Sequence, residues 1–265
     1  MTTMQIASFT FHEVCDDPAE SGWQRAAALP YKHSTRVYRE HLDEIAKSST
    51  APALLTDLTT AERHVALTFD DGGVSNVAAG DELARRGWRG FFFIVTGLTG
   101  TRGFMDATQI KYLRSCGHAI GSHSETHPDI FRALKPEQMR EEWRVSRDKL
   151  SAMLGEPCDT ASIPGGDGSP LVYEMAAQAG LRTLFTSEPK LEPAQVNEMH
   201  VLGRVCLKRD TAPARVRELA QFRGWQRENA IRRAKVGARV LLFPAYKAYV
   251  YWKTRPFATA GSRQE

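Results

Sequence analysis

Two adjacent carboxylates and two histidines four residues apart are the side chains of this sequence best suited to chemistry. Asp70 and Asp71 directly follow an apolar run at residues 65–69, which is typical of a buried strand. Like charges this close resist ionising together, so a strand end that keeps both usually holds a cation or a reaction beside them. The alternative interpretation is a plain polar turn, because Gly72 and Gly73 come next.

His123 and His127 follow a second apolar segment. Histidines at this spacing lie on one face of a helical turn, so both imidazoles can reach one ion. The spacing alone is a weak signal, because surface histidines often fall four apart by coincidence. Two imidazoles and one carboxylate, however, form a ligand set that leaves positions open for water and substrate. The sequence therefore predicts a divalent metal site in which one aspartate is a ligand and the other accepts a proton.

Segments that resemble strands and helices alternate around these residues. Apolar runs are the expected strands, and caps and closing glycines mark the helices between them. The expected strands are 5–11, 65–69, 91–95, 118–121, 159–163 and 183–185, and the expected helices are 35–47, 74–86, 106–117, 136–154 and 170–179. This order is typical of a parallel α/β fold, and we predict a (β/α) barrel of about seven parallel strands.

The unusual residues fall at the carboxyl ends of the expected strands, which is where chemistry collects in such folds. Asp70 and Asp71 end one strand, and His123 and His127 follow another. A glycine-rich loop at 164–168 follows a third strand, and the segment 187–189 follows a fourth. This shared position predicts one active face.

Length and composition suit one large domain with an extension, since the chain has 265 residues, of which 42% are hydrophobic and 25% charged. The first residues have neither a basic region nor a long apolar stretch, so we expect no signal peptide and a cytoplasmic protein. The four cysteines lie far apart without a C-x-x-C pair. That pattern fits a reducing compartment and indicates neither a disulfide framework nor a thiolate zinc site.

Basic residues gather near the C-terminus. Residues 204–255 contain 14 lysines and arginines against three acidic residues, whereas the net charge of the whole chain is +4. We predict an amphipathic helix over 224–243 whose inward side chains are Trp225, Ile231, Ala234, Ala238 and Leu241. We therefore divide the chain into a barrel, 1–215, and a basic helical extension, 216–265.

Aromatic residues accompany these cations at 243–252. Basic side chains beside interfacial aromatics suit an anionic membrane surface. They indicate no nucleic acid, because no recognisable binding motif comes with them. The extension is thus expected to pack on the barrel or to lie at a membrane surface, and the two interpretations are compatible.

Two phrases of the sequence resemble a known family. Thr-Phe-Asp-Asp-Gly at 68–72 and His-Ser-Glu-Thr-His at 123–127 are similar to the first two motifs of the polysaccharide deacetylases, a family of metal-dependent carbohydrate esterases. The resemblance implies a distorted (β/α) barrel that removes N-acetyl groups from an amino sugar. It also implies that Asp70 is the general base, and that Asp71, His123 and His127 bind a divalent metal. Zinc is favoured, with cobalt, nickel, iron or manganese as alternatives.

The same resemblance suggests residues around the substrate. A backbone N–H near Gly72 or Gly73 would stabilise the oxyanion, and Ser124 would hold the histidine loop by hydrogen bonds. The third motif of the family has an arginine two residues before a proline, but Ser162 stands at that place here. The loop after it is predicted to approach the substrate closely through Pro164, Gly165, Gly166 and Asp167.

The last two motifs of the family also differ here. Glu188 takes the place of an aspartate and is a candidate catalytic residue. Arg209, in an expected strand at 202–210, stands near the place of the acid histidine. An arginine is a poor proton donor, so we assign Arg209 to substrate binding. His12 directly follows the first strand, where related deacetylases often carry a Tyr-His pair, and it is the candidate for the missing acid.

Three functions compete on these grounds. The leading hypothesis is a cytoplasmic metal-dependent N-deacetylase acting on a lipid-linked or nucleotide-linked precursor of a surface glycan. The second is a deformylase or cyclic-amide hydrolase, because the loop at 164–166 differs from the polysaccharide-cleaving pattern. The third is a catalytically weak glycan-binding or scaffolding protein, because the arginine and the acid histidine are not where the family has them. The intact Asp70 argues against this last hypothesis.

Overall fold

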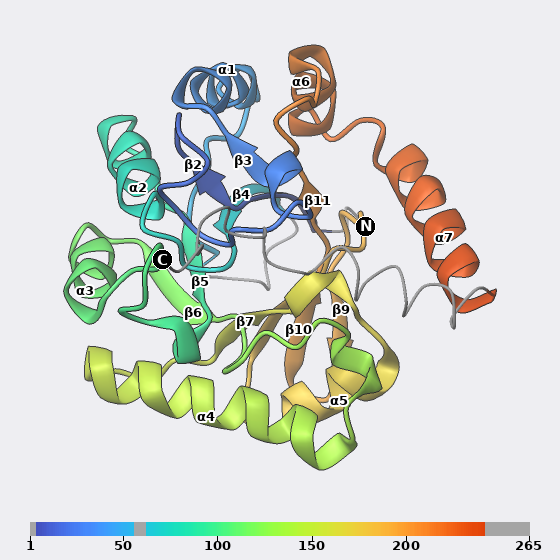
Figure 1. The fold of residues 1–265 in the computed structure, drawn as a ribbon. Coiled ribbons are helices and arrows are strands. Elements are labelled where there is room, and N and C mark those ends of the chain that lie inside the picture. Colours follow the sequence, from blue (N-terminus) through green and yellow to red (C-terminus); the bar gives the residue numbers. More distant parts are fainter. Residues whose placement is uncertain (1–3, 56–61, 242–265) are drawn as a thin grey trace, which may run out of the picture.

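One curved sheet forms the frame of the protein (Figure 1). In the computed structural model, which describes residues 4–55 and 62–241, this sheet has nine strands. The strands are β1 (Gln5–Phe11), β4 (Arg63–Phe69), β5 (Phe91–Ile94), β6 (Ala119–Ser122), β7 (Thr160–Ser162), β8 (Thr183–Phe185), β9 (Ala194–Val196), β10 (Met199–Leu202) and β11 (Val205–Cys206). Their order is β11-β1-β4-β5-β6-β7-β8-β10-β9, and only the β9–β10 pair is antiparallel.

Helices surround this sheet on its outer side (Figure 1). They are α1 (Thr35–Ile45), α2 (Asn76–Arg85), α3 (Ala107–Ser115), α4 (Pro136–Leu154), α5 (Pro170–Gln178), α6 (Pro213–Ala220) and α7 (Trp225–Leu241). Two of the predicted caps are present: the Ser34 hydroxyl accepts a hydrogen bond from the Val37 N–H, and Asp106 forms a capping box with Gln109. A separate parallel pair consists of β2 (Glu13–Val14), which follows β1 almost directly in the sequence, and β3 (Lys32–His33).

The sheet closes at a two-residue link. β10 lies beside β8 near one end of the strand order, and β11 pairs with β1 at the other end. Only Gly203 and Arg204 connect them, so the two ends of the sheet must lie close together. A side chain at Gly203 does not fit, because a Cβ there would lie 2.4 Å from the Glu188 carbonyl oxygen. The curved sheet is therefore a distorted barrel.

Alternation along the strands separates an inner from an outer core. Ala66 belongs to a small apolar cluster inside the barrel, together with Phe93 and Phe185. Leu67 and Phe69 point the other way and join the larger cluster under the helices. Asp70 keeps the inward register of Ala66, so the strand delivers its carboxylate to the mouth of the barrel.

The predicted α/β barrel is confirmed, and among the described residues its sheet has nine strands instead of about seven. The predicted strand at 202–210 is wrong. Residues 199–206 form two strands, β10 and β11, and the chain turns between them at Gly203 and Arg204. The sequence pattern missed this turn because apolar residues flank it on both sides.

The core continues past residue 215. Val216, Leu219 and Trp225 belong to the main apolar cluster, and the Trp225 ring meets the Phe9 ring edge-on at 6.1 Å. Helix α6 therefore packs on the barrel, and the packed region extends at least to the start of α7. The aromatic residues at 243–252 lie outside the described part of the chain. Within the described part, no helix is both long and apolar enough to span a bilayer.

Helix α7 is present as predicted, but its orientation differs. Trp225 is buried, whereas Ile231 and Ala234 are exposed to solvent, so their predicted inward positions are wrong. Arg232 lies on the inner side instead, where it donates hydrogen bonds to the Gly166 carbonyl and to the Glu188 carboxylate. The surface beneath this helix is polar, so the cationic Arg232 side chain packs there in place of an apolar one. The side chains of residues 238–241 are outside the description.

Candidate active site

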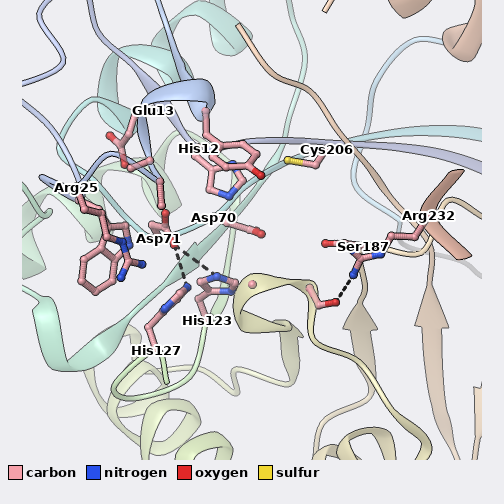
Figure 2. Close-up of a pocket in the computed structure, with 16 residues that line it drawn as sticks. His12, Glu13, Arg25, Asp70, Asp71, His123, His127, Ser187, Cys206 and Arg232 are labelled. Atoms are coloured by element: carbon pink, nitrogen blue, oxygen red, sulfur yellow. Dashed lines mark hydrogen bonds and ion pairs between the residues drawn. The ribbon is translucent and has the colours of Figure 1, made fainter. Parts of the chain in front are cut away.

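A cavity of about 220 Å³ opens at the carboxyl ends of the strands (Figure 2). Its walls come from segments far apart in sequence, because the barrel brings the strand ends together. The residues that line it are His12, Glu13, Trp23, Arg25, Ala27, Ala28, Tyr31, Asp70, Asp71, His123, His127, Gly165, Gly166, Ser187, Cys206 and Arg232. The strand ends predicted to form one active face therefore do so.

Asp71, His123 and His127 lie together at the bottom of this cavity. The Nε2 atoms of both histidines are 3.5 Å from the Asp71 Oδ1 atom (Figure 2). One ligand atom from each residue lies within 4.8 Å of the others. The three side chains are buried or nearly so, so an ion between them would be shielded from bulk water.

The histidine segment is a loop and not the helical turn used to predict it. Ser124 and His127 both have positive φ, 65° and 53°. Hydrogen bonds hold this strained backbone: the Ser124 hydroxyl accepts from the His127 N–H at 3.0 Å, and the Ser122 hydroxyl accepts from the Ser124 N–H. The Glu142 carboxylate accepts from two further N–H groups of the loop. The prediction that Ser124 holds the loop agrees with this geometry.

The protonation of both histidines suits metal binding. Burial lowers the pKa of His127 to about 4 despite the nearby Asp71 carboxylate, and burial also lowers the pKa of His123. The Nδ1 atom of His123 lies 3.0 Å from the Ser162 carbonyl oxygen, and donation to that oxygen leaves the Nε2 lone pair free. Two neutral imidazoles beside an ionised carboxylate are donors that fit a divalent cation.

Asp70 has different partners from its neighbour. Both of its carboxylate oxygens accept hydrogen bonds from Arg204, Oδ1 from Nη1 at 2.8 Å and Oδ2 from Nη2 at 3.0 Å. The Ser162 hydroxyl donates to Oδ1 at 3.0 Å. Burial raises the pKa of Asp70, but the charge and hydrogen bonds of Arg204 outweigh burial and hold that pKa well below its usual range. Asp70 is therefore ionised and held in a fixed orientation.

Arg204 is a site residue that the sequence analysis missed, as it did the cavity-lining Arg25 and Arg232. Its side chain is completely buried inside the barrel, where Nε donates to the Thr186 carbonyl and Nη1 also donates to the Thr68 hydroxyl. Its guanidinium carbon lies 5.7 Å and 5.8 Å from the ring centres of Phe93 and Phe185. The arginine missing at position 162 thus has a counterpart in the link between β10 and β11. An arginine inside an otherwise apolar segment was the available signal.

His12 lies across Asp70 and Asp71 from the two metal-site histidines (Figure 2). Its ring is tilted against the Tyr31 ring, with the ring centres 4.8 Å apart. Burial lowers the pKa of His12, but the charge and the hydrogen bond of Cys206, followed by the charges of Asp71 and Asp70, raise it to about 10. The structure thus brings this predicted residue to the cavity in a form that holds a proton.

Only part of the predicted glycine-rich loop reaches the cavity. Gly165 and Gly166 line the cavity, but Asp167 is turned away and pairs with Arg132. Asp167 thus helps to fix the loop, and we find no support for its predicted contact with substrate. Pro164 is buried at the start of the same short helix, η4 (Pro164–Gly166).

Glu188, Arg209, Gly72 and Gly73 are also outside the cavity lining. The Glu188 carboxylate accepts from the Arg232 Nε atom at 3.3 Å, which leaves it a structural partner of α7. Arg209 is exposed, because β11 ends at Cys206 and the chain leaves the sheet before reaching it. Gly73 packs directly against the Glu13 carboxylate, where a Cβ would lie 2.2 Å from its oxygens.

Comparisons with known proteins agree with this geometry. Residues 57–184 match the family model described as polysaccharide deacetylase. A deacetylase from Streptococcus pyogenes, PplD, has a similar structure with a TM-score of 0.68 at 18% identity, covering 83% of this chain and 99% of that one. IcaB from Ammonifex degensii gives 0.67 at 20% identity, covering 82% and 97%. The structural likeness establishes the barrel fold.

A curated relative matches over a shorter stretch. A protein named gellan lyase, from a Bacillus species, is 30% identical over 103 residues, which are 38% of this chain and 4% of that protein. The chain therefore corresponds to a small part of that relative. The family model matches just under half of the chain, and the similar structures share its barrel fold, so the chain resembles the polysaccharide deacetylases.

Proposed function

We propose that the protein is a metal-dependent hydrolase that removes an N-acetyl group from an amino sugar, as a step in making a surface glycan. One observation carries the proposal: two carboxylates adjacent in sequence have separate partners. Asp71 faces two imidazoles, while Asp70 is held by the Arg204 guanidinium. A binding protein has no need for a second, oriented carboxylate. The amino sugar itself is inferred from the family match and from neighbours named as deacetylases.

Asp71, His123 and His127 would hold the divalent ion. When bound there, such an ion supplies Lewis-acid activation of water and of the amide carbonyl. The burial of these side chains and the neutral state of the imidazoles favour the ion over competing protons. Zinc is the ion we propose, since imidazole and carboxylate donors suit it.

The protein's own residues would move two protons. Asp70, kept ionised by Arg204, accepts a proton from the attacking water. The C–N bond of the amide then breaks, and the leaving nitrogen needs a proton to depart as an amine. His12 lies on the opposite side of the carboxylate pair and holds a proton, so it is placed to supply one. The products are acetate and the free amino sugar.

Acetate release from N-acetylhexosamine substrates tests this proposal. The protein is stripped of metal with a chelator, reloaded with zinc, and assayed for acetate and for bound metal. We expect release that depends on metal, and no release from any amide by protein with bound metal would overturn the proposal. Parallel assays with N-formyl and cyclic-amide substrates would distinguish a deacetylase from the related hydrolases with the same fold.

A further inference from the structure

Helix α7 presents three apolar side chains to solvent. Ala230, Ile231 and Ala234 are all exposed, and Ile231 keeps 39% of its surface in contact with solvent. At 100° per residue these three side chains fall on one side of the helix, opposite the buried Trp225. We call Ala230, Ile231 and Ala234 the apolar strip. A helix that covers a barrel normally turns its apolar side chains toward the barrel and its polar side chains toward solvent.

Cations surround the apolar strip. Arg227, Arg233 and Lys235 are exposed, and none of them forms an ion pair with a residue in the described part of the chain. The outer face of α4 differs, because Arg144 there pairs with Glu141 and Asp148. Arg144 on α4 is thus neutralised within its own helix, whereas Arg227, Arg233 and Lys235 on α7 remain available to an external anion.

The inner side of α7 is fixed to the active site. Arg232 donates to the Gly166 carbonyl and to the Glu188 carboxylate, and it lines the cavity. Figure 2 shows this side chain reaching the cavity wall beside Ser187. The helix therefore carries the apolar strip on one side and a wall of the cavity on the other.

We propose that α7 docks on an anionic lipid bilayer. Apolar side chains ringed by cations are the arrangement of helices that lie in a membrane interface. The unpaired cations would meet lipid phosphates while the apolar strip enters the headgroup region. A nucleic acid would gain nothing from the strip. By sequence, basic and aromatic residues continue beyond the helix at 243–255, which is the composition such an interface favours.

Docking through α7 would also select substrates. Since Arg232 joins this helix to the cavity, a docked protein would hold the cavity close to the lipid surface. Resting on the proposed function, we infer that the N-acetylated sugar is attached to a lipid anchor in that surface. Docking itself depends only on the surface of α7.

Vesicle co-sedimentation tests the docking. The full chain is mixed with vesicles of phosphatidylcholine containing phosphatidylglycerol, and with vesicles of phosphatidylcholine alone. We expect binding to the first and little to the second. Each cation near an anionic membrane contributes about fivefold in binding, so the double variant Arg233→Gln, Lys235→Gln should bind about 25-fold more weakly. Ile231→Asp should lose about tenfold.

Matched controls lie on other helices. Leu171→Asp replaces an apolar residue that is 40% exposed on α5, and Lys111→Gln with Arg140→Gln removes two exposed cations from α3 and α4. Figure 1 places α3 on the far side of the barrel from α7. These controls should bind vesicles like the unaltered protein. Equal losses in controls and α7 variants would show a general charge effect and overturn the proposal.

Two further results would also overturn it. In the first, the unaltered protein does not bind vesicles but self-associates, and Ile231→Asp abolishes the self-association. The apolar strip would then be a contact between copies of the chain. In the second, the unaltered protein does not bind vesicles, and Ile231→Asp lowers the melting temperature. The apolar strip would then pack against another part of the same chain. Acetate release from a soluble sugar should be unchanged in the α7 variants, whereas release from a lipid-anchored sugar should fall with binding. Absent release from both sugars would contradict the proposed function and leave the vesicle result standing.

Discussion

The two sides of the cavity are built in different ways. Asp71, His123 and His127 come from short phrases at the ends of β4 and β6, which match the family motifs. On the other side, Arg204 comes from the link between β10 and β11, and His12 from the end of β1. The comparison teaches that the residues proposed to bind a metal can be found in short phrases of the sequence, whereas the residues proposed to move protons are brought together only by the fold. We call these two groups the metal side and the proton-transfer side.

Asp71→Asn should reduce turnover and metal binding together, with a loss of turnover matched only by Asp70→Asn. Asparagine keeps the shape and tolerates the positive φ of 77° at this position, but it removes the charge between two imidazoles. We expect bound metal to fall and acetate release to drop about 10³-fold, since a bound metal supplies several kcal/mol. Asp148→Asn, in an exposed ion pair of α4, is the control. Full metal content with full activity in Asp71→Asn would remove this residue from the site.

His12→Gln should reduce acetate release from an N-acetyl sugar about 10²-fold, because general acid catalysis is lost. Metal content should stay the same, since His12 lies across the carboxylates from the other two histidines. An aryl acetate needs no proton on its leaving group, so its hydrolysis should be nearly unaffected. Equal losses on both substrates would show that His12 acts by shaping the cavity and not as an acid.

Arg204→Gln should lower turnover less and stability more. Removing one partner of a buried ion pair costs about 3–5 kcal/mol of unfolding free energy. Without the guanidinium, burial would dominate and raise the pKa of Asp70. Since the ionised form is the base, the acid limb of the pH–rate profile should move to higher pH.

Two measurements separate these effects of Arg204. Chemical denaturation gives the loss of stability, and rates across pH give the shift of the acid limb. Arg204→Lys keeps the charge but loses the paired hydrogen bonds, so it should shift the limb less. A less stable protein with an unchanged pH profile would mean that Arg204 supports the barrel without controlling the base.

The sequence was sufficient for the barrel and for the clustering of Asp71, His123 and His127. Strand β1 and helix α4 have the predicted bounds, because alternation, caps and closing glycines act locally. Arg204 could not be assigned in this way. Its contact with Asp70 spans 134 positions and depends on the closure of the sheet at Gly203, which no local pattern encodes.

Helix α7 shows a second limit of the sequence. Periodicity located the helix, but it placed Ile231 inward on the assumption that apolar side chains face the barrel. The barrel surface beneath the helix is polar, with the Gly166 carbonyl and the Glu188 carboxylate, so Arg232 lies inward instead. Glu188 was predicted as catalytic from its position in the sequence. Its ion pair with Arg232, which occupies the carboxylate, could not be read from the sequence.

Among the substitutions considered, His33→Gln on β3 should have the smallest effect on turnover at neutral pH. Burial, together with His41, lowers the pKa of His33 to about 3 from an ordinary value of 6.5. The unfolded chain therefore binds a proton that the folded protein does not, and stability should fall as pH drops from about 6.5 toward 3. The full cost is about 5 kcal/mol.

Unfolding free energies measured across this pH range check the expectation. His33→Gln should flatten the dependence, because glutamine does not titrate. The metal side should contribute little to the slope in the loaded protein, since bound metal keeps His123 and His127 unprotonated. An equally steep slope in His33→Gln would place the acid sensitivity elsewhere.

The division of labour between Asp70 and Asp71 is tested most directly by Asp70→Asn, with metal content and acetate release measured on the same sample. Asparagine keeps the size of the side chain and one oxygen for Arg204, but it cannot accept the proton. We predict one bound metal per chain, as in the unaltered protein, and acetate release lowered by about 10³-fold. Acetate release at the original rate would contradict the account, and so would loss of the metal, which would make Asp70 a ligand.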